Sequence, residues 1–375
     1  MRPVVISGTG VFTPHETITN AELVEAFNAY ATKQNEANAD AIATGEMEPM
    51  AMSDEGFIFK ASGIEQRYVM DKQGVLDPDI MHPTLRQRTD DEPGIMAEMA
   101  VDAARKALEA AGRKPEDVDA VICAASNHER AYPAIAIEVQ ELLGIQGFGF
   151  DMNVACSSAT FGIQAAADMI RSGSADCILM VNPEICSGHL EWRDRDCHFI
   201  FGDVCTAVVL EAKEKATSDA QFEIISTRCL TQFSNNIRNN NGFLRRTRPD
   251  GTADRRDMQF MQNGRQVFKQ VVPIVSQMVV EHCEDEGIDP TTLQRMWLHQ
   301  ANKSMNDFIG RKVLGREPTR EEQPNILQDY ANTSSAGSII AFSQNSNDLE
   351  NDALGIICSF GAGYSVGNVI VRKVA

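Results

Sequence analysis

The chain has 375 residues, a composition ordinary for a soluble globular protein, and a formal net charge of 34 − 53 = −19. That negative balance argues against nucleic-acid binding, and the lack of any run of about 18 apolar residues argues against a membrane-spanning helix. The nine cysteines are an odd number without paired CxxC spacing, which predicts reduced thiols and a cytoplasmic location.

The first half of the chain alternates predicted strands and helices. Asn20 is expected to cap a helix that buries Leu23 and Phe27. Two segments, about 32–53 and 71–92, interrupt the pattern as insertions, and the first is predicted to be helical. The expected strands are residues 4–8, 120–125, 148–154 and 177–181, and the expected helices are residues 93–111, 133–144 and 157–171.

The second half repeats this alternation. The motif Ala-Cys-Ser-Ser-Ala around Cys156 resembles Asn-Thr-Ser-Ser-Ala from Asn332, which predicts an internal duplication. Buried strands between helices predict mainly parallel sheets that are covered on both faces. The expected strands are residues 222–230, 296–299, 355–360 and 366–372, and the expected helices are residues 264–286, about 303–314 and 334–343.

Cys156 lies where an apolar strand pattern ends and a run of small residues opens a helix. A thiol at that junction meets the positive end of the helix dipole and unpaired backbone N–H groups, and both favour the thiolate. The position therefore predicts a nucleophile. An inert buried cysteine is the alternative.

A nucleophilic cysteine needs a hydrogen-bonding partner and donors for an oxyanion. His299 follows a short buried strand, Asn332 opens a predicted helix, and residues 361–363 form a Gly-Ala-Gly turn. All of them lie at predicted strand ends, so with Cys156 they form a candidate site. A satisfied core histidine and a simple N-cap asparagine are the alternatives.

Eight short motifs occur in one order along the chain. They are Gly63-Ile64 with Arg67, Ala131-Tyr-Pro133, Asp151-Met-Asn-Val-Ala-Cys156, Phe201-Gly-Asp203, Met261-x-x-Gly264 with Val267-Phe-Lys269, His299-Gln-Ala-Asn302, Asn332-Thr-Ser334 and Phe360-Gly-x-Gly363. In these motifs the chain resembles the β-ketoacyl-ACP synthase III group of condensing enzymes, in the thiolase superfamily. The resemblance covers residues 4–374 apart from the two insertions.

The resemblance implies an α/β fold of the thiolase type, with five layers αβαβα and two duplicated halves. Residues 1–215 would form the half that carries Cys156, and residues 216–375 the half that carries His299 and Asn332.

The resemblance also implies a division of roles. Cys156 would carry the acyl group, while His299 and Asn332 would donate hydrogen bonds to the malonyl thioester as it loses CO₂. The N–H groups of Cys156 and Ala362 would form the oxyanion hole, in the turn that contains Gly361 and Gly363. Phe360 would border the departing carboxylate.

Substrate-binding residues are implied in the same way. Phe57 matches an aromatic residue that stacks on the adenine of CoA, and Tyr132 matches a dimer-interface position near the acyl pocket, so a homodimer is implied. Lys303 and Ser304 stand where the family usually has an arginine. The residues implied to bind CoA phosphates or acyl carrier protein are Arg67, Lys269, Lys303, Arg311 and Lys312, and charge alone adds Arg265.

Positive charge is concentrated between residues 238 and 270. Eight basic and three acidic residues give this segment +5, which leaves −24 on the remainder. Such a segment suggests a site for phosphates or for an acidic protein, and a solvated loop is the alternative. The basic residues are Arg238, Arg245, Arg246, Arg248, Arg255, Arg256, Arg265 and Lys269.

Other signals are weaker. Cys186-x-x-His189 with Cys197-His198 fits no usual zinc spacing, so no metal is expected. The Gly-x-Gly at residues 361–363 lacks the βαβ context of a dinucleotide site, and His128 is expected in a solvated loop.

The sequence therefore predicts decarboxylative Claisen condensation of an acyl-CoA with malonyl-ACP, without a cofactor. Because the insertion at residues 32–53 resembles that of medium-chain relatives that load octanoyl-CoA to give β-ketodecanoyl-ACP, a medium-chain primer is predicted. The alternatives are a related Cys-His-Asn condensing enzyme, of secondary metabolism or of head-to-head acyl condensation, and a non-catalytic module that binds acyl-CoA or carrier protein.

Overall fold

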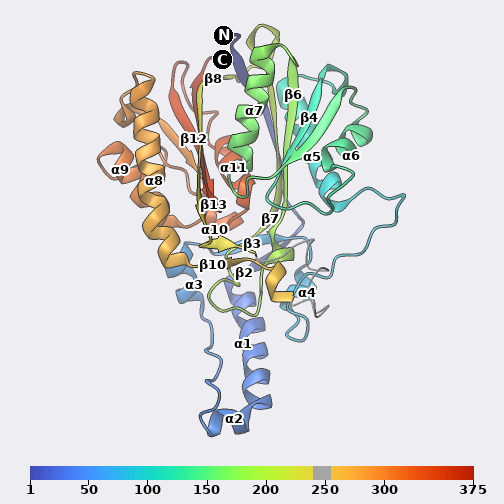
Figure 1. Ribbon diagram of the computed structural model, residues 1–375, viewed down its shortest axis with the longest axis vertical. Helices are drawn as coiled ribbons and strands as arrows, with labels where there is room; N and C mark the ends of the chain where they lie inside the picture. The colour runs from blue at the N-terminus through green and yellow to red at the C-terminus, as the bar shows by residue number, and fades with distance from the viewer. Residues whose placement is uncertain (240–254) are drawn as a thin grey trace.

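A nine-stranded sheet forms the centre of the computed structural model, which describes residues 1–239 and 255–375 (Figure 1). The strand order is β11-β12-β13-β8-β1-β7-β6-β4-β5. The strands are β1 (Val4–Phe12), β4 (Ala120–Ala124), β5 (Phe148–Met152), β6 (Cys177–Ile185), β7 (Asp203–Ala212), β8 (Phe222–Ser234), β11 (Arg295–Leu298), β12 (Leu354–Gly361) and β13 (Gly363–Lys373).

The sheet divides into two halves at the junction of β1 and β8. These strands pair only through Val5 with Glu223 and Ile6 with Phe222, whereas β13 pairs along most of β8. One half therefore contains β11, β12, β13 and β8, and the other contains β1, β7, β6, β4 and β5. The domain boundary expected near residue 215 stays a prediction.

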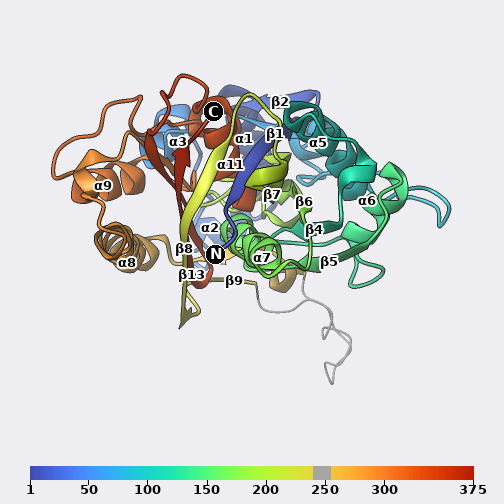
Figure 2. The same ribbon diagram turned by 90° about the horizontal axis from the view of Figure 1, so that it is seen from above.

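Helices complete five layers, in the order αβαβα (Figures 1 and 2). The central helices α7 (Ser158–Ser172) and α11 (Gly337–Gln344) lie between the two halves of the sheet. Helices α5 (Ile95–Ala111) and α6 (Ile135–Leu143) cover the outer face of the β1 half. Helices α8 (Gly264–Asp285) and α9 (Lys303–Leu314) cover the outer face of the β8 half.

Each interface between layers has its own apolar core, because each helix buries one apolar face. The central core joins α7 and α11 to both halves of the sheet, and the two outer cores lie under α5–α6 and α8–α9. Helix α5 approaches β1 so closely that only small residues fit between them. A Cβ on Gly8 would lie 2.3 Å from the carbonyl oxygen of Ala107, and a Cβ on Gly10 would lie 2.1 Å from that of Ala103. The alanines of α5 therefore pack directly on the glycines of β1.

Strand direction differs from the sequence prediction. Only β4–β5, β4–β6 and β11–β12 are parallel, while the five other pairs of this sheet are antiparallel. The expectation of mainly parallel sheets is wrong, because buried strands lose the alternating pattern in either direction when both faces are covered. The missed strand β7 accounts for two of the antiparallel pairs.

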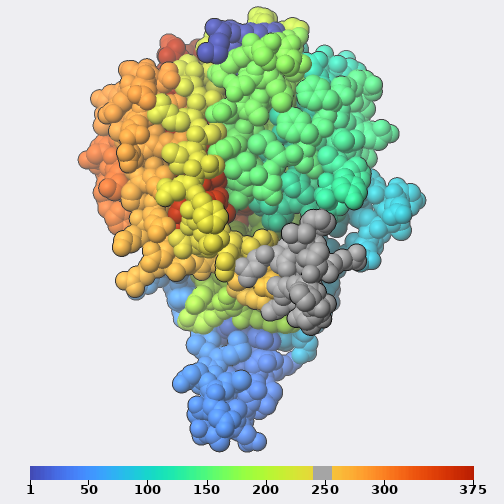
Figure 3. Space-filling model, viewed as in Figure 1, coloured from blue at the N-terminus to red at the C-terminus, as the bar shows by residue number. Residues whose placement is uncertain are grey.

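The N-terminal insertion forms a stalk that projects from the layered body (Figures 1 and 3). Helix α1 (Asn20–Ala37) and the short α2 (Ala39–Ala43) form it, and residues 44–54 return without helix, so the insertion is helical only in part. Thr19, not Asn20, caps α1 through a reciprocal capping box with Glu22.

Smaller elements lie around the base of the stalk. The helices are α3 (Glu55–Ser62), α4 (Lys72–Leu76) and α10 (Leu327–Tyr330), and the paired short strands are β2 (Glu16–Thr19) with β3 (Gln66–Val69) and β9 (Ile237–Arg238) with β10 (Met261–Gln262). No helix in the described part of the chain has both the length and the apolar character needed to cross a bilayer.

Candidate active site

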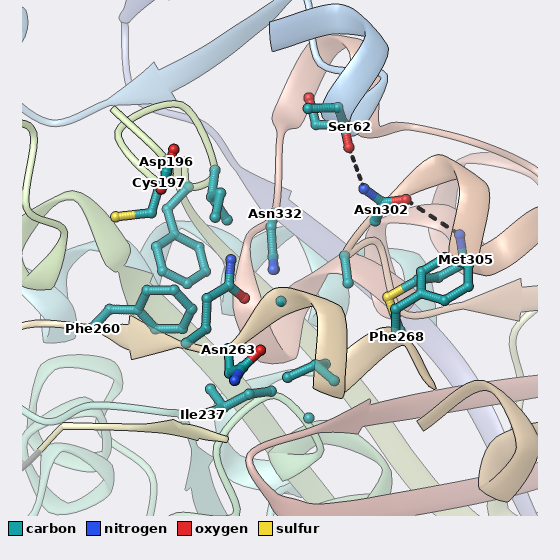
Figure 4. Close-up of a pocket in the computed structure, with 18 of the residues that line it drawn as sticks. Ser62, Asp196, Cys197, Ile237, Phe260, Asn263, Phe268, Asn302, Met305 and Asn332 are labelled. Carbon is teal, nitrogen blue, oxygen red and sulfur yellow. Dashed lines mark hydrogen bonds between the residues drawn. The ribbon is translucent and has the colours of Figure 1, made fainter. Parts of the chain in front are cut away.

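A cavity of about 720 Å³ brings the three chemically interesting side chains together. Cys156, His299 and Asn332 all line it, from segments that are far apart in the sequence. Its walls come from α3, the N-terminal turns of α8 and α9, and the loop of residues 194–201 (Figure 4). Most of the lining is apolar or aromatic, as is usual for a small-molecule site.

Cys156 lies between the end of β5 and the first turn of α7, as the sequence predicts. Ala155, directly before it, has a left-handed backbone with φ of 49°, which a non-glycine residue rarely adopts. Close packing fixes the other side: a Cβ on Gly361 would lie 2.6 Å from the Cβ of Cys156 and 3.0 Å from its Sγ. Only glycine lets the end of β12 approach the sulfur this closely.

The thiol of Cys156 is neutral at rest, contrary to the sequence prediction. Burial raises its pKa to about 11, and the buried carboxyl of Glu184 adds to the increase. Hydrogen bonds from the Ser334 hydroxyl, 3.4 Å from Sγ, and from the Ala362 backbone act in the opposite direction. The helix terminus does favour the thiolate, but desolvation outweighs it.

His299 directly follows β11 and is also neutral. Its side chain is buried, and burial lowers the pKa to about 4, while a backbone hydrogen bond with Ser334 acts in the opposite direction. The ring meets Phe360 edge-on, with centroids 5.2 Å apart. A neutral imidazole has one N–H donor and one acceptor, so His299 can donate one hydrogen bond without carrying charge.

Asn332 presents its amide N–H₂ group to the cavity (Figure 4). Its backbone pairs with the loop of residues 200–202, through Asn332 N to Ile200 O at 2.9 Å and Gly202 N to Asn332 O at 3.1 Å. Its Oδ1 accepts a hydrogen bond of 2.9 Å from the N–H of Ser334. Because the oxygen is occupied, the orientation of the amide is set, and the Nδ2 donor group is the part of the side chain that faces the cavity.

Glu184 anchors the turn that follows Asn332, and the sequence reasoning did not find it. This buried carboxylate accepts bonds from the Ser126 N–H at 2.9 Å, from the Ser335 N–H at 3.2 Å and from both hydroxyls. Burial raises its pKa to about 7. An acidic residue inside the apolar strand of residues 177–185 was the available signal, because such a group needs buried partners.

Comparisons with known proteins identify the family to which this chain belongs. Models of 3-oxoacyl-[acyl-carrier-protein (ACP)] synthase III and of its C-terminal part match residues 150–231 and 283–373. The β-ketodecanoyl-[acyl-carrier-protein] synthase of Pseudomonas aeruginosa PAO1 is 57% identical over 350 residues, which cover 93% of this chain and all of that protein. The chain belongs to the β-ketoacyl-ACP synthase III family.

More distant relatives agree with this assignment. The β-ketoacyl-[acyl-carrier-protein] synthase III of Granulibacter bethesdensis is 28% identical over 377 residues, covering 99% of this chain and all of that protein. The crystal structure of 3-oxoacyl-[acyl-carrier-protein] synthase III from Aquifex aeolicus VF5 has a TM-score of 0.75 at 24% identity, with 98% and 99% of the two chains covered. This likeness confirms the thiolase-type fold. By its family, the protein is a condensing acyltransferase of fatty acid biosynthesis.

The residues implied to bind CoA or carrier protein lie on the cavity wall or on helices α8 and α9, with one exception described below, and their binding roles stay a prediction. Phe57 on α3 lines the cavity, and the guanidinium of Arg195 lies 4.1 Å from the centre of its ring. The exposed basic residues Arg265 and Lys269 lie on α8, and Lys303, Arg311 and Lys312 lie on α9. Lys303 pairs with Asp307, and Arg311 pairs with Glu317. Arg245, Arg246 and Arg248 lie outside the described residues.

Arg67 is the exception. Its side chain is fully buried, and its guanidinium donates to Ile18 O at 3.1 Å, Asn20 Oδ1 at 2.8 Å and Phe199 O at 3.3 Å. Burial lowers its pKa to about 9. The interpretation of Arg67 as a CoA- or carrier-binding residue is therefore corrected: it joins β3, the start of α1 and the cavity loop, out of reach of a phosphate.

Two further expectations concern the position of Tyr132 and a possible metal site. Tyr132 does not line it, and its side chain is 84% exposed. Cys186, His189, Cys197 and His198 do not form a cluster of ligand atoms. Among the described residues the one such trio is Cys123, His128 and Asp151, where the Asp151 oxygens already accept bonds from the Ile135 and Ala136 N–H groups.

We expect the reactivity of Cys156 to follow its raised pKa. Because the thiolate is the nucleophile, alkylation by iodoacetamide should accelerate about tenfold per pH unit between about pH 7 and pH 10, without a plateau. Peptide mass mapping assigns the modified residue, and Cys156→Ala provides the background from the other cysteines. A plateau below about pH 9 would contradict the raised pKa.

Proposed function

We propose that the protein extends a medium-chain acyl-CoA, such as octanoyl-CoA, with malonyl-ACP by decarboxylative Claisen condensation, giving a 3-oxoacyl-ACP. The observation that carries this is the convergence of Cys156, His299 and Asn332 on one apolar cavity. The relative that is 57% identical supports the chain length, because its name specifies a β-ketodecanoyl product.

In the first half-reaction, the sulfur of Cys156 attacks the thioester carbonyl of the acyl-CoA. The proton of the thiol passes to the departing CoA sulfur, so CoA leaves as a neutral thiol. The N–H groups of Cys156 and Ala362 stabilise the oxyanion, in line with the hydrogen bonding between Ala362 and Sγ. Gly361 and Gly363 keep the turn free of side chains that would cover these donors.

In the second half-reaction, the malonyl thioester loses CO₂ and leaves an enolate. The N–H of neutral His299 and Nδ2 of Asn332 donate to its oxygen, while Phe360 packs beside His299 where the carboxylate departs. The enolate carbon then attacks the acyl carbonyl on Cys156, the new C–C bond forms, and the C–S bond breaks. Decarboxylation supplies the carbanion equivalent, so two neutral donors suffice without a strong base.

The surface beside the cavity suits the two carriers of acyl groups. Phe57, which lines the cavity and has the guanidinium of Arg195 over its ring, would stack on the adenine of CoA. Arg265, Lys269 and Lys312 give the otherwise acidic protein a local positive surface that attracts an acidic carrier protein. The nine free cysteines are consistent with a reducing cytoplasm.

Chain length can be measured directly. We expect Cys156 to acquire an octanoyl group at least about tenfold faster than an acetyl group, because the longer chain can make more contacts with the apolar side chains that line the cavity. Intact mass spectrometry of the protein with each acyl-CoA follows loading, and Cys156→Ser is the control that should not load.

Faster acetyl loading would contradict the proposed medium-chain primer but would still be consistent with the proposed condensation. No loading from any acyl-CoA would favour a binding module instead. Addition of malonyl-ACP with mass analysis of the product tests the second half-reaction, and acyl-CoA self-condensation without malonyl-ACP would favour the head-to-head alternative.

The two halves of the chemistry should separate by mutation. His299→Ala should leave Cys156 loading within about fivefold and lower malonyl-dependent product formation by about 10²-fold or more, because it removes a donor to the enolate. Acyl-enzyme should accumulate in this variant, as intact mass would detect. Equal loss of loading in His299→Ala and Cys156→Ser would contradict the assigned roles.

We also propose a homodimer that pairs through β5. This strand ends the sheet, and an uncovered edge favours pairing with another strand. Exposed apolar side chains surround it: Tyr132 at 84%, Ile137 at 49% and Phe148 at 43%. A second copy would cover these residues and bring Tyr132 toward its partner.

A charge placed at this edge should prevent the pairing. We expect Phe148→Glu and Ile137→Glu to elute as monomers in size-exclusion chromatography with light scattering, while the unchanged protein elutes as a dimer. Met47→Glu adds the same charge to a similarly exposed side chain on the distant stalk and should stay dimeric. A monomeric unchanged protein, or dimeric edge variants, would contradict the proposal.

A further inference from the structure

Ser334 contacts all three residues of the candidate active site. Its hydroxyl lies 3.4 Å from the Sγ of Cys156, and its N–H donates to Oδ1 of Asn332 at 2.9 Å. Its backbone also lies beside His299, where it favours the protonated imidazole and so opposes the lowering of the pKa by burial. Neither the motifs nor the family comparison assigns a role to this hydroxyl.

The surrounding structure holds the hydroxyl in place. The backbone of Ser334 is left-handed, with φ of 50°, and the residue is buried. On one side Asn332 is tied to Ile200, and on the other Ser335 donates twice to buried Glu184. A strained conformation persists only where its surroundings enforce it, and such positions concentrate at functional sites.

The charges around Cys156 create a need for this donor. His299 is neutral, and Glu184 disfavours a negative sulfur. Among the described residues that line the cavity, Arg256 has the one cationic side chain, and it forms an ion pair with Asp194. In the part of the chain that the structure describes, a thiolate formed on Cys156 therefore has neutral donors to stabilise it.

We propose that Ser334 is a fourth catalytic residue, whose hydroxyl donates a hydrogen bond to Sγ of Cys156 whenever that sulfur carries negative charge. The proposal rests on the function proposed above and concerns two steps of that reaction. When Cys156 attacks the acyl-CoA, the donor favours the developing thiolate. When the enolate displaces the acyl group, the C–S bond breaks and its electron pair goes to Sγ.

The second step, in which the enolate displaces the acyl group from Cys156, needs nothing beyond the enolate, the acyl-enzyme and a proton from solvent. The enolate carbon gains the bond to the acyl carbon, Sγ leaves as a thiolate held by Ser334 and the Ala362 N–H, and a proton from solvent restores the thiol. The hydroxyl of Ser334 keeps its own proton throughout and acts as a donor only.

The variant Ser334→Ala tests the role cleanly. It removes the hydroxyl and keeps the N–H that orients Asn332. We expect alkylation of Cys156 by iodoacetamide at pH 8 to slow about 10- to 100-fold, the range for losing a hydrogen bond to a charged group. This measurement needs no substrate, so it tests Ser334 even if the proposed condensation is wrong. Single-turnover transfer from octanoyl-enzyme to malonyl-ACP should slow by a similar factor.

Two further variants complete the design. Ser338→Ala removes a buried hydroxyl of α11 that pairs with Ser359 at 2.8 Å, away from the sulfur, and should alkylate within about twofold of the unchanged protein. Ser334→Gly suits the left-handed backbone and should behave as Ser334→Ala does if alanine impairs folding. Thermal unfolding identifies the folded variants. Alkylation within twofold of normal in a folded Ser334→Ala or Ser334→Gly would overturn the proposal.

Discussion

The packing of Cys156 against the backbone of Gly361 is the contact on which the rest of the site depends. The sulfur belongs to the β1 half of the sheet, and Gly361 ends β12 in the other half, so this contact joins the two where their strands converge. A single Cβ would separate them. Because the contact is so close, chain connectivity alone brings Phe360 and Ala362 beside the sulfur, where the proposed oxyanion donor and the proposed border of the departing carboxylate are needed.

The same close packing removes water, and this decides the electrostatics. Burial holds Cys156 as a thiol and His299 as a neutral imidazole, so the resting site contains no thiolate–imidazolium pair. The malonyl substrate enters with a carboxylate that it loses as CO₂. In the proposed reaction, neutral donors such as Asn332 would stabilise the enolate without holding the carboxylate in place, so the site would favour departure of CO₂ over tight binding of the substrate.

Much of this architecture can be predicted from sequence, because it depends on local patterns. The strand–helix junction at Cys156, the amphipathic α5 and the strand end at His299 are examples. Properties that arise from distant segments cannot be read in this way. The pKa of Cys156 depends on Gly361 and Ser334, which are about 200 residues away, and Arg67 is enclosed by β2, α1 and the loop at Phe199.

A high pKa on the nucleophile fits a protein that receives its acyl group from one thiol and must hold it for a second substrate. A sulfur of high pKa is a poor leaving group. In the proposed reaction, an acyl group on Cys156 would therefore resist displacement until the enolate forms beside it. As the C–S bond breaks, the sulfur gains negative charge and needs hydrogen-bond donors to stabilise it. The hydroxyl of Ser334, 3.4 Å from Sγ, would supply one such hydrogen bond.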